Sequence, residues 1–450
     1  MTAIAKQADA KSRTAPQTGI GWLGIVRMGT VQAAIGAMVM LATSLFNRVM
    51  VVEYSVAAAI PAALVAWHYA VQITRPLWGY KSDQSRSRTP WIVAGLSILA
   101  CGSVLAVDVT IMMADPGIGT ALLAVLSFTM IGFGVGMSGT ALLALLASRV
   151  STARKPAAAA ISWTMMIAGI VIAAGLSGAF LDPFSEPRLA IVTSIVVLVA
   201  FCAAMLALRN LERDNPPVAQ QSAKHDQQSF PDALREIWKD GEARRFTFFV
   251  FISMLAYSMQ DLIMEPFAGF LFAMTPGEST QLSSLQHSGI LVGMLVAGLG
   301  GSLYAKRFGA NLKLWIVVGC VGSAIMLGGL SFAATQGVAW PLKANVFGLG
   351  MMNGVFAVAA VGAMLGLASR GRGSAEGARM GVWGASQAIA FGLGGLTGAV
   401  LVDQLRAFTG QDAAAFQIVF SIEAILFVAA ALVATGTTLV RPTQKEEAFA

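Results

Sequence analysis

Long apolar stretches recur along the whole chain and are separated by short polar segments. Twelve of these stretches approach the length, about 20 residues, that an α-helix needs to cross a bilayer. One long charged segment separates the first six from the last six. We therefore predict an all-α membrane protein with twelve transmembrane helices, spans 1 to 12, at 23–47, 55–79, 90–113, 118–147, 157–181, 188–209, 246–273, 284–304, 312–333, 341–368, 379–403 and 413–439.

The polar segments divide the chain into five parts. We predict a cytoplasmic N-terminal tail (1–22), an N-terminal six-helix bundle (23–209), a cytoplasmic linker (210–245), a C-terminal six-helix bundle (246–439) and a cytoplasmic tail (440–450). The first apolar stretch follows a polar segment without a cleavage signal, so we expect it to act as an uncleaved signal anchor.

Composition and charge agree with a membrane protein. The chain has 56% hydrophobic residues, 12% charged residues and a mean hydropathy of +0.71, which excludes an ordinary soluble domain. With the N-terminus in the cytoplasm, all 30 Lys and Arg residues except Arg48, Arg188, Lys343 and Arg406 fall on the cytoplasmic side. This bias predicts that both termini are cytoplasmic, and it explains the net charge of +7 without nucleic-acid binding.

Six spans, a linker and six more spans is the hydropathy plan of the major facilitator superfamily, whose two pseudo-symmetric bundles surround a midplane cavity. The loop after span 2 resembles the loop signature of that superfamily through Gly79, Asp83, Arg86 and Arg88. An Asp beside a helix end accepts from backbone N–H groups, and basic neighbours favour lipid headgroups. We predict a cytoplasmic latch that favours one open state; simple membrane-anchoring charges are the alternative.

Polar residues also recur at corresponding places in spans 1 and 7, which face each other in this plan. The set is Asn47, Arg48, Glu53, Gln260, Asp261 and Glu265. Charge inside a membrane is costly unless it is paired or faces water, so we expect these residues to line the cavity. Arg48 and Asp261 could form an ion pair or gate across the pseudo-twofold axis. A purely structural ion pair at the outer end is the alternative.

Several of these segments resemble one family. Residues 45–53, 79–83, 88–92, 257–266 and 377–384 are similar to the PucC/LhaA family, and the resemblance covers nearly the whole chain. It implies a non-enzymatic member of the major facilitator superfamily in a purple phototrophic bacterium. Such a protein assembles antenna complexes, light-harvesting 1 or 2, in the intracytoplasmic photosynthetic membrane. The chain departs from the family pattern at 65–69 and 83–88, so a divergent paralogue from a bacteriochlorophyll gene cluster is a further interpretation.

The resemblance also implies partners. These are the antenna polypeptides and membrane lipids, with bacteriochlorophyll synthase and the membrane insertion machinery as further candidates. Bacteriochlorophyll itself is expected as a transient ligand rather than a resident cofactor, and we predict no metal site. Its magnesium takes an axial ligand, most simply a neutral imidazole. His68 in span 2, with Gln72 one turn on and Trp67 adjacent, is the candidate; a helix-to-helix hydrogen bond is the alternative.

Two other functions compete with antenna assembly. A secondary transporter of a small molecule would use Asp261 or Glu265 as its proton-coupling carboxylate, and a gated cavity serves that function equally well. An enzyme that attaches an isoprenoid tail would need paired Asp-x-x-x-Asp motifs to hold magnesium diphosphate, and the sequence has none. We therefore predict that the protein is not an enzyme.

Overall fold

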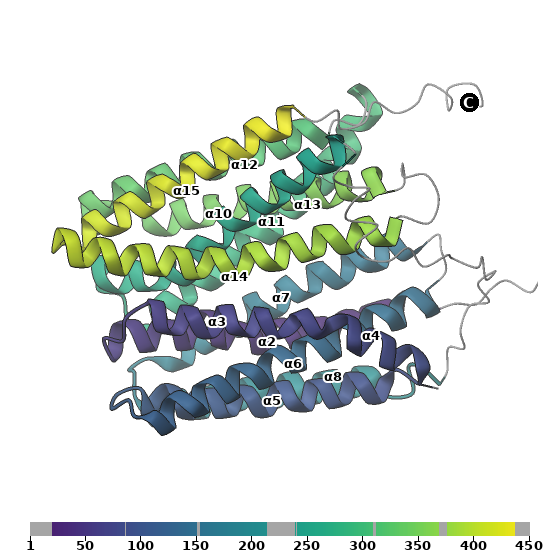
Figure 1. Ribbon diagram of the computed structural model, residues 1–450, viewed down its shortest axis with the longest axis horizontal. Helices are drawn as coiled ribbons and strands as arrows, with labels where there is room; N and C mark the ends of the chain where they lie inside the picture. Colours follow the sequence, from purple (N-terminus) through teal and green to yellow (C-terminus); the bar gives the residue numbers. More distant parts are fainter. Residues whose placement is uncertain are drawn as a thin grey trace, which may run out of the picture.

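Helices make up nearly all of the chain that the structure describes (Figure 1). The computed structural model describes residues 20–85, 87–150, 154–213, 239, 241–308, 312–368 and 376–436. Almost all of the predicted N-terminal tail, most of the predicted linker, the predicted C-terminal tail and Arg86 lie outside these residues.

The N-terminal half contains the first six spans. They are α2 (Trp22–Met40) with the π-helical turns η1 (Leu41–Phe46) and η2 (Val49–Glu53); α3 (Ala59–Val71), η3 (Gln72–Thr74) and α4 (Arg75–Gln84); α5 (Thr89–Met112); α6 (Ile118–Arg149); α7 (Lys155–Leu181); and α8 (Glu186–Leu208). The C-terminal half contains α10 (Gly241–Phe272), α11 (Pro276–Phe308), α12 (Leu312–Gln336), η5 (Gly337–Ala339), α13 (Leu342–Ala368), α14 (Glu376–Thr409) and α15 (Asp412–Thr435).

Several helix starts follow directly from local sequence. Pro90 and Pro187 lie in the first turns of α5 and α8, where a missing N–H costs no intrahelical hydrogen bond. The Ser185 hydroxyl accepts from the backbone N–H of Arg188 at 3.4 Å and so caps α8. These signals fix where the chain leaves a loop and re-enters the helical bundle.

Within the part of the chain that the structure describes, ten helices are long and apolar enough to cross a membrane. They correspond to predicted spans 1, 3 to 7 and 9 to 12. Span 2 is helical but is interrupted by η3, and its α4 carries Arg75 and Lys81. Span 8 is α11, whose first turns are rich in Ser, Thr and Gln. The protein is therefore a multi-pass membrane protein.

The two halves repeat the same packing pattern. In the N-terminal half α2 packs against α7 and α8, α5 against α6 and α8, and α3 against α6. In the C-terminal half the corresponding spans pair in the same way: α10 with α14 and α15, α12 with α13 and α15, and α11 with α13. Each half has its own hydrophobic core. The halves meet where α7 packs on α11 and where α14 packs on α3, and the pseudo-symmetry exchanges these two contacts.

Close helix approach depends on glycine at a few positions. A Cβ added at Gly293 of α11 would lie 1.9 Å from the Met351 carbonyl oxygen of α13, and one at Gly350 would lie 2.0 Å from the Gln286 carbonyl oxygen. Only glycine lets these two backbones approach so closely, as is typical of helix pairs in membranes.

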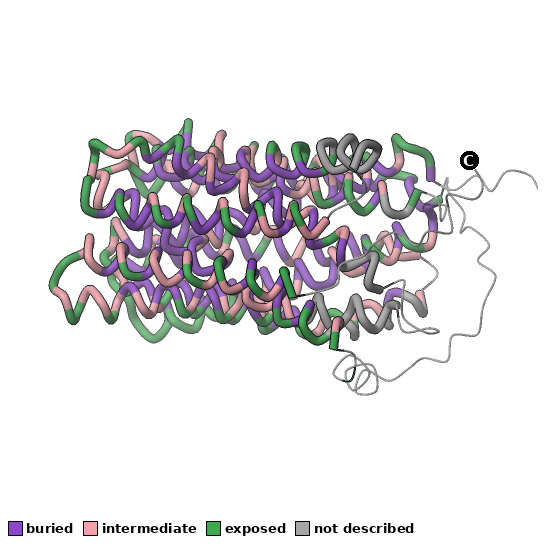
Figure 2. The backbone as a smooth tube through the Cα atoms, turned by 90° about the horizontal axis from the view of Figure 1, so that it is seen from above, coloured by how far each residue is buried: buried purple, intermediate pink, exposed green. Residues whose placement is uncertain are grey.

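The outer surface of the bundle is apolar. Figure 2 shows buried residues inside the bundle and exposed residues along its outer faces. Many exposed side chains there are large hydrophobes, among them Leu122, Ile195 and Leu198. A soluble protein rarely exposes such a continuous apolar surface, whereas lipid chains cover it without cost.

Candidate functional site

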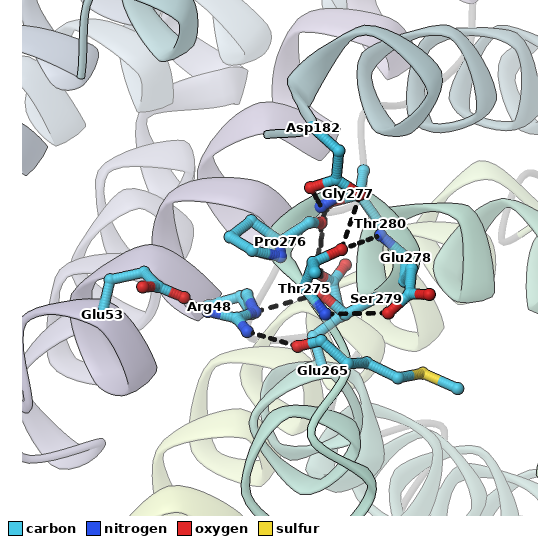
Figure 3. Close-up of polar contacts among 11 residues, drawn as sticks. Arg48, Glu53, Asp182, Glu265, Thr275, Pro276, Gly277, Glu278, Ser279 and Thr280 are labelled. Carbon is cyan, nitrogen blue, oxygen red and sulfur yellow. Dashed lines mark hydrogen bonds and ion pairs between the residues drawn. The ribbon is translucent and has the colours of Figure 1, made fainter. Parts of the chain in front are cut away.

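A polar network joins the two halves at one end of the bundle, which we call the network end. Its centre is Arg48 in span 1, whose side chain is almost completely buried. Arg48 pairs with Glu53 (Nη1–Oε1 2.5 Å) and donates to Ser279 Oγ at 3.0 Å and to the Met274 carbonyl at 2.8 Å. Figure 3 shows these residues converging from both halves of the chain. The guanidinium therefore binds across the interface.

The prediction that Arg48 pairs with Asp261 is wrong. The carboxylate that pairs with Arg48 is that of Glu53, in the same half. Side chains five residues apart point about 140° apart on an α-helix, but Val49–Glu53 is wound as a π-helix, with wider turns that bring the two ends together. Glu265, one turn beyond Asp261, is the acidic residue of span 7 that lies within electrostatic range of Arg48.

Glu265 is bound from both halves. Ser44 of span 1 donates to its carboxylate, and Thr280 of α11 donates at 3.5 Å. Ser44 also contacts Ser283 of α11, with the two hydroxyl oxygens 3.1 Å apart. Four buried side chains on three helices therefore converge at one point below Arg48.

Asn47 supplies a hydrogen bond that proline removes from the opposite helix. Pro266 lies inside α10 and has no N–H, so it cannot donate to the carbonyl of Leu262 four residues earlier. Asn47 of span 1 donates to that carbonyl at 2.7 Å. A buried carbonyl without a partner is costly in a membrane, so this bond ties the proline site of α10 to span 1.

Two aspartates cap helices across the interface in a symmetric way. Asp182, directly after α7, accepts from the Gly277 N–H at 3.2 Å and from Thr275 Oγ1 at 2.6 Å, at the start of α11. Asp403, near the end of α14, accepts from the backbone N–H groups of Ala58 at 3.2 Å and Ala59 at 2.8 Å, at the start of α3. A carboxylate at a helix N-terminus satisfies free N–H groups and the helix dipole. The pseudo-symmetry exchanges these caps, and both lie at the network end.

An open pocket of about 750 Å³ lies above the network. Arg48, Glu53, Asp182, Met274 and Pro276 are among the residues that line it. Glu53, whose side chain is 30% exposed, can therefore be reached from the surface at this end. The other network residues, Arg48, Ser44, Asn47 and Glu265, are buried beneath it. The arrangement closes one end of the space between the halves.

Asp261 faces a different group of side chains. It lies within electrostatic range of Tyr69 of α3, Tyr257 of α10 and Glu423 of α15. Both tyrosine rings pack on Phe391 of α14, with centroids 5.7 and 5.6 Å from it. This aromatic group joins both halves, and it is separate from the Arg48 network in its contacts. Gln260, the neighbour of Asp261, is fully buried.

The structure brings together two of the three candidate pigment residues. His68 is buried; its Nδ1 lies 3.0 Å from the Val65 carbonyl and its Nε2 lies 2.9 Å from Gln72 Nε2. Because the Gln72 amide donates, Nε2 accepts and Nδ1 carries the proton. Trp67 is 46% exposed, and its Nε1 donates to Thr129 at 2.8 Å on the outer face of the bundle. His68 would have to give up Gln72 before its Nε2 could bind a metal.

The predicted loop latch is anchored by a residue that the sequence did not single out. Glu212, just after α8, accepts from Ser87 Oγ at 2.5 Å, from the Arg88 N–H at 2.9 Å and from the Thr89 N–H at 2.9 Å. Arg149 also donates to it at 3.2 Å. The structure does not describe the side chain of Asp83 or any part of Arg86; Gly79 lies within α4.

Hydrogen bonds dominate the charge state of Glu212. Burial alone raises the pKa of its carboxyl, but the bonds from Ser87, Thr89 and Arg88 outweigh this and lower the pKa to about 2. The carboxylate is therefore charged at all ordinary pH values and holds the loop after span 2 against the end of span 6.

Sequence reasoning missed Asp182, Asp403 and Glu212. All three lie near helix ends, and each caps a helix or loop that is remote in the sequence. The available signal was an acidic residue beside a helix end, which indicates a cap but not which helix it caps.

Comparison with known proteins identifies the family. The sequence profile of the PUCC protein family matches residues 45–442. The chain belongs to the PucC family. It is 47% identical over 424 residues, 94% of this chain and 97% of the relative, to the "Bacteriochlorophyll synthase 44.5 kDa chain" of Rhodobacter capsulatus. It is 28% identical over 449 residues, 94% of this chain and 93% of the relative, to "Protein PucC" of the same species.

Solved structures establish the fold of this PucC-family chain. The nucleoside transporter NupG is similar with a TM-score of 0.65 and 15% identity, covering 93% of this chain and 100% of NupG. An autoinhibited POT family peptide transporter is similar with a TM-score of 0.66 and 13% identity, covering 93% of this chain and 99% of that one. The predicted major facilitator superfamily fold is confirmed. At this level of identity the likeness concerns the fold alone.

The Glu212 anchor gives a prediction for acid stability. Glu212→Gln should lower the free energy of unfolding in detergent by about 2 kcal/mol near neutral pH, because charge-assisted hydrogen bonds are weakened. Since the folded pKa is lowered, the contribution of Glu212 is fully present above its ordinary pKa of 4.5 and is lost as pH falls towards about 2. Thermal unfolding from pH 6 to pH 3 should therefore show a smaller loss in the variant. Identical acid dependence of both proteins would contradict the anchor.

The Asp182 and Asp403 caps give a prediction about how firmly the two halves are held together at the network end. In a protein whose native Cys101, Cys202 and Cys320 are replaced, Ser283→Cys places a thiol beneath the network. Asp182→Ala and Asp403→Ala each remove about 1 kcal/mol from the stability of the contact between the halves. Together they raise the ratio of open to closed protein roughly thirtyfold. Alkylation by a membrane-impermeant maleimide should accelerate by at least about tenfold.

Asp412→Ala is the matched control for closure. Asp412 pairs with Arg406 at 2.6 Å near the same end, but both residues belong to the C-terminal half. Adding Asp412→Ala to the Ser283→Cys protein should leave the alkylation rate unchanged. A double variant that reacts as slowly as this control would show that the caps do not hold the halves closed.

Proposed function

We propose that the protein is a non-enzymatic assembly factor for light-harvesting complexes in a purple phototrophic bacterium. It acts in the intracytoplasmic photosynthetic membrane with both termini in the cytoplasm. It docks antenna polypeptides of light-harvesting 1 or 2, and it holds or passes bacteriochlorophyll during assembly. Bacteriochlorophyll synthase and the membrane insertion machinery are its further partners in this proposal.

Family membership carries the proposal. The profile match spans residues 45–442, and the relatives include proteins named PucC and a protein named for bacteriochlorophyll synthase. The geometry supports an assembly role through two features. An apolar outer surface is suited to contact with single-span helices. The bonds of Arg48 and of the Asp182 and Asp403 caps between the halves, which we call the clamp, can break and reform, which gives the bundle two states.

Arg48 of the clamp and Asp261 of the separate aromatic group provide a test in the native host. Arg48→Ala leaves Glu53, Ser279 and the Met274 carbonyl without their common partner, and Asp261→Asn removes the acidic group of the aromatic cluster. In a deletion strain complemented with either variant, antenna absorbance should fall to less than about half of the wild-type value, since losing a buried charge partner costs several kcal/mol. Immunoblots of membranes should show normal insertion.

Arg406→Ala is the control for this complementation test. It removes another arginine from the same end whose ion pair, with Asp412, stays within one half. Antenna absorbance should stay near the wild-type level in this strain. Normal absorbance with Arg48→Ala would count against a function for the clamp in assembly, and normal absorbance with Asp261→Asn would count against a function for the aromatic group.

Pigment handling has its own test at His68. We expect protein purified in mild detergent from a phototrophically grown host to retain bacteriochlorophyll, and His68→Ala to remove most of it, because the Nε2 lone pair is lost. Trp67→Ala is the matched neighbour, since Trp67 bonds to Thr129 on the outer face. Absorption spectra and pigment extraction measure both. Equal amounts of pigment in wild type and His68→Ala would show that His68 is not the pigment ligand. That result would leave the proposed docking of antenna polypeptides untouched.

A further inference from the structure

A group of buried polar side chains in the core of the C-terminal half lacks hydrogen-bond partners. Gln260 of α10, Asn353 of α13 and Glu423 of α15 are each 0% exposed. Five of their side-chain polar atoms have no hydrogen-bond partner within the described part of the chain. These are both amide atoms of Gln260, both carboxylate oxygens of Glu423 and the amide nitrogen of Asn353. Buried polar groups in native proteins are nearly always satisfied, so this group needs an explanation.

Helix packing places the three residues at one level. Phe267 of α10 stacks edge-on with Phe420 of α15 at 4.9 Å between centroids, and Gln260 lies two turns from Phe267 on the same face. Phe267 also packs on Phe416 of α15 at 5.4 Å between centroids, so its level on α15 lies between Phe416 and Phe420. Because the two helices are antiparallel, the level of Gln260 lies about two turns beyond that midpoint, within about half a turn of Glu423.

The third helix reaches the same level through another aromatic contact. Phe356 of α13 packs on Phe427 of α15 at 5.6 Å between centroids. Asn353 precedes Phe356 by one turn and Glu423 precedes Phe427 by one turn, and α13 and α15 run in the same direction. Ser323 of α12 donates to Asn353 Oδ1 at 2.8 Å and so adds a fourth helix to the group.

Among the described residues, no Lys, Arg or His side chain pairs with Glu423, and Lys343 of α13 is exposed at the start of its helix. On α10 the neighbouring acid is Asp261, which lies within electrostatic range of Glu423, whereas the Glu265 carboxylate is bound by Ser44 and Thr280. On α12 the buried ionisable group is Cys320. The described charged groups of α14 are Asp403 and Arg406; Asp403 caps α3 and Arg406 is paired with Asp412.

A bare carboxylate in this interior would be very unfavourable, and the nearby acid Asp261 makes it worse. A single bound positive charge removes both penalties. The oxygens available are those of Glu423, Gln260, Asn353 and Ser323, and hard cations prefer carboxylate, amide and hydroxyl oxygens.

We propose that Glu423, Gln260 and Asn353 form an exchangeable site for one monovalent cation, a proton or Na⁺, inside the C-terminal half. The site is distinct from the Arg48 network and does not depend on the proposed role in antenna assembly. It lies against α10, the helix that also carries Asp261 and Glu265. Occupancy therefore changes the charge next to the helix that the network holds.

Thermal unfolding of the purified full-length protein tests the site. A ligand that binds only the folded state raises the melting temperature with concentration. If the cation is Na⁺, raising NaCl from 1 to 300 mM against choline chloride at constant ionic strength should raise the melting temperature by at least about 3 °C. If it is a proton, NaCl has no specific effect, and the melting temperature should instead fall by a similar amount as pH rises from 5 to 9.

Glu423→Gln and Asp412→Asn separate this site from other charges. Glu423→Gln keeps the shape but removes the negative charge and the oxygen that takes up a proton, so it should lose the specific response to NaCl or to pH. Asp412→Asn removes a paired carboxylate from the same helix and should respond as wild type does. Wild type and Glu423→Gln that respond identically to both NaCl and pH would overturn the proposal.

A second variant covers the case in which Glu423→Gln does not fold. Gln260→Met keeps the side-chain length but removes the amide oxygen. It should shift the NaCl concentration of half-maximal effect by at least about tenfold, or the pH midpoint by about one unit, which is the same factor in binding. Wild-type midpoints in this variant would equally overturn the site.

Discussion

The rest of the closed bundle depends on the burial of one guanidinium. Arg48 is 1% exposed in a chain that lies in a membrane, and a charge in that position requires several partners at good geometry. No single helix supplies them. Glu53 comes from the same span, whereas Ser279 and the Met274 carbonyl come from the other half. Satisfying this one charge therefore brings the halves together at one end, and separating them exposes it again.

The neighbouring contacts reinforce this closure with groups that are otherwise unsatisfied. The Leu262 carbonyl, freed by Pro266, takes its hydrogen bond from Asn47. The first N–H groups of α3 and the start of α11 take theirs from Asp403 and Asp182. Each bond uses a backbone group that a helix start or a proline leaves free, so these polar contacts add specificity to the apolar packing of α7 on α11.

Hydropathy and charge were sufficient to predict the architecture. The twelve helical positions, the division into two pseudo-symmetric halves and the superfamily fold all follow from the spacing of apolar and basic residues, because the bilayer leaves few alternatives. The grouping of polar residues in spans 1 and 7 was also visible, and the structure does place Asn47 and Arg48 of span 1 at the contact with α10 and α11. Their roles stay predictions.

The individual partners were not predictable from sequence. The Arg48–Glu53 pair depends on local π-helical winding, which hydropathy does not report. Asp182, Asp403 and Glu212 act on helices and loops remote in sequence, and the identity of each target depends on how the helices pack. Gln260 was visible as a cavity residue, but its lack of partners and its level beside Glu423 required the packing of four helices.

The most direct test of the central claim follows newly made antenna polypeptides in the native host. Antenna subunits would be pulse-labelled during phototrophic growth, crosslinked in the membrane and recovered with the affinity-tagged protein at successive times. An assembly factor predicts that label binds the protein first and then moves into mature light-harvesting complexes, and that assembly slows in a deletion strain. Label that never binds the protein, together with assembly at the normal rate in the deletion strain, would contradict this account.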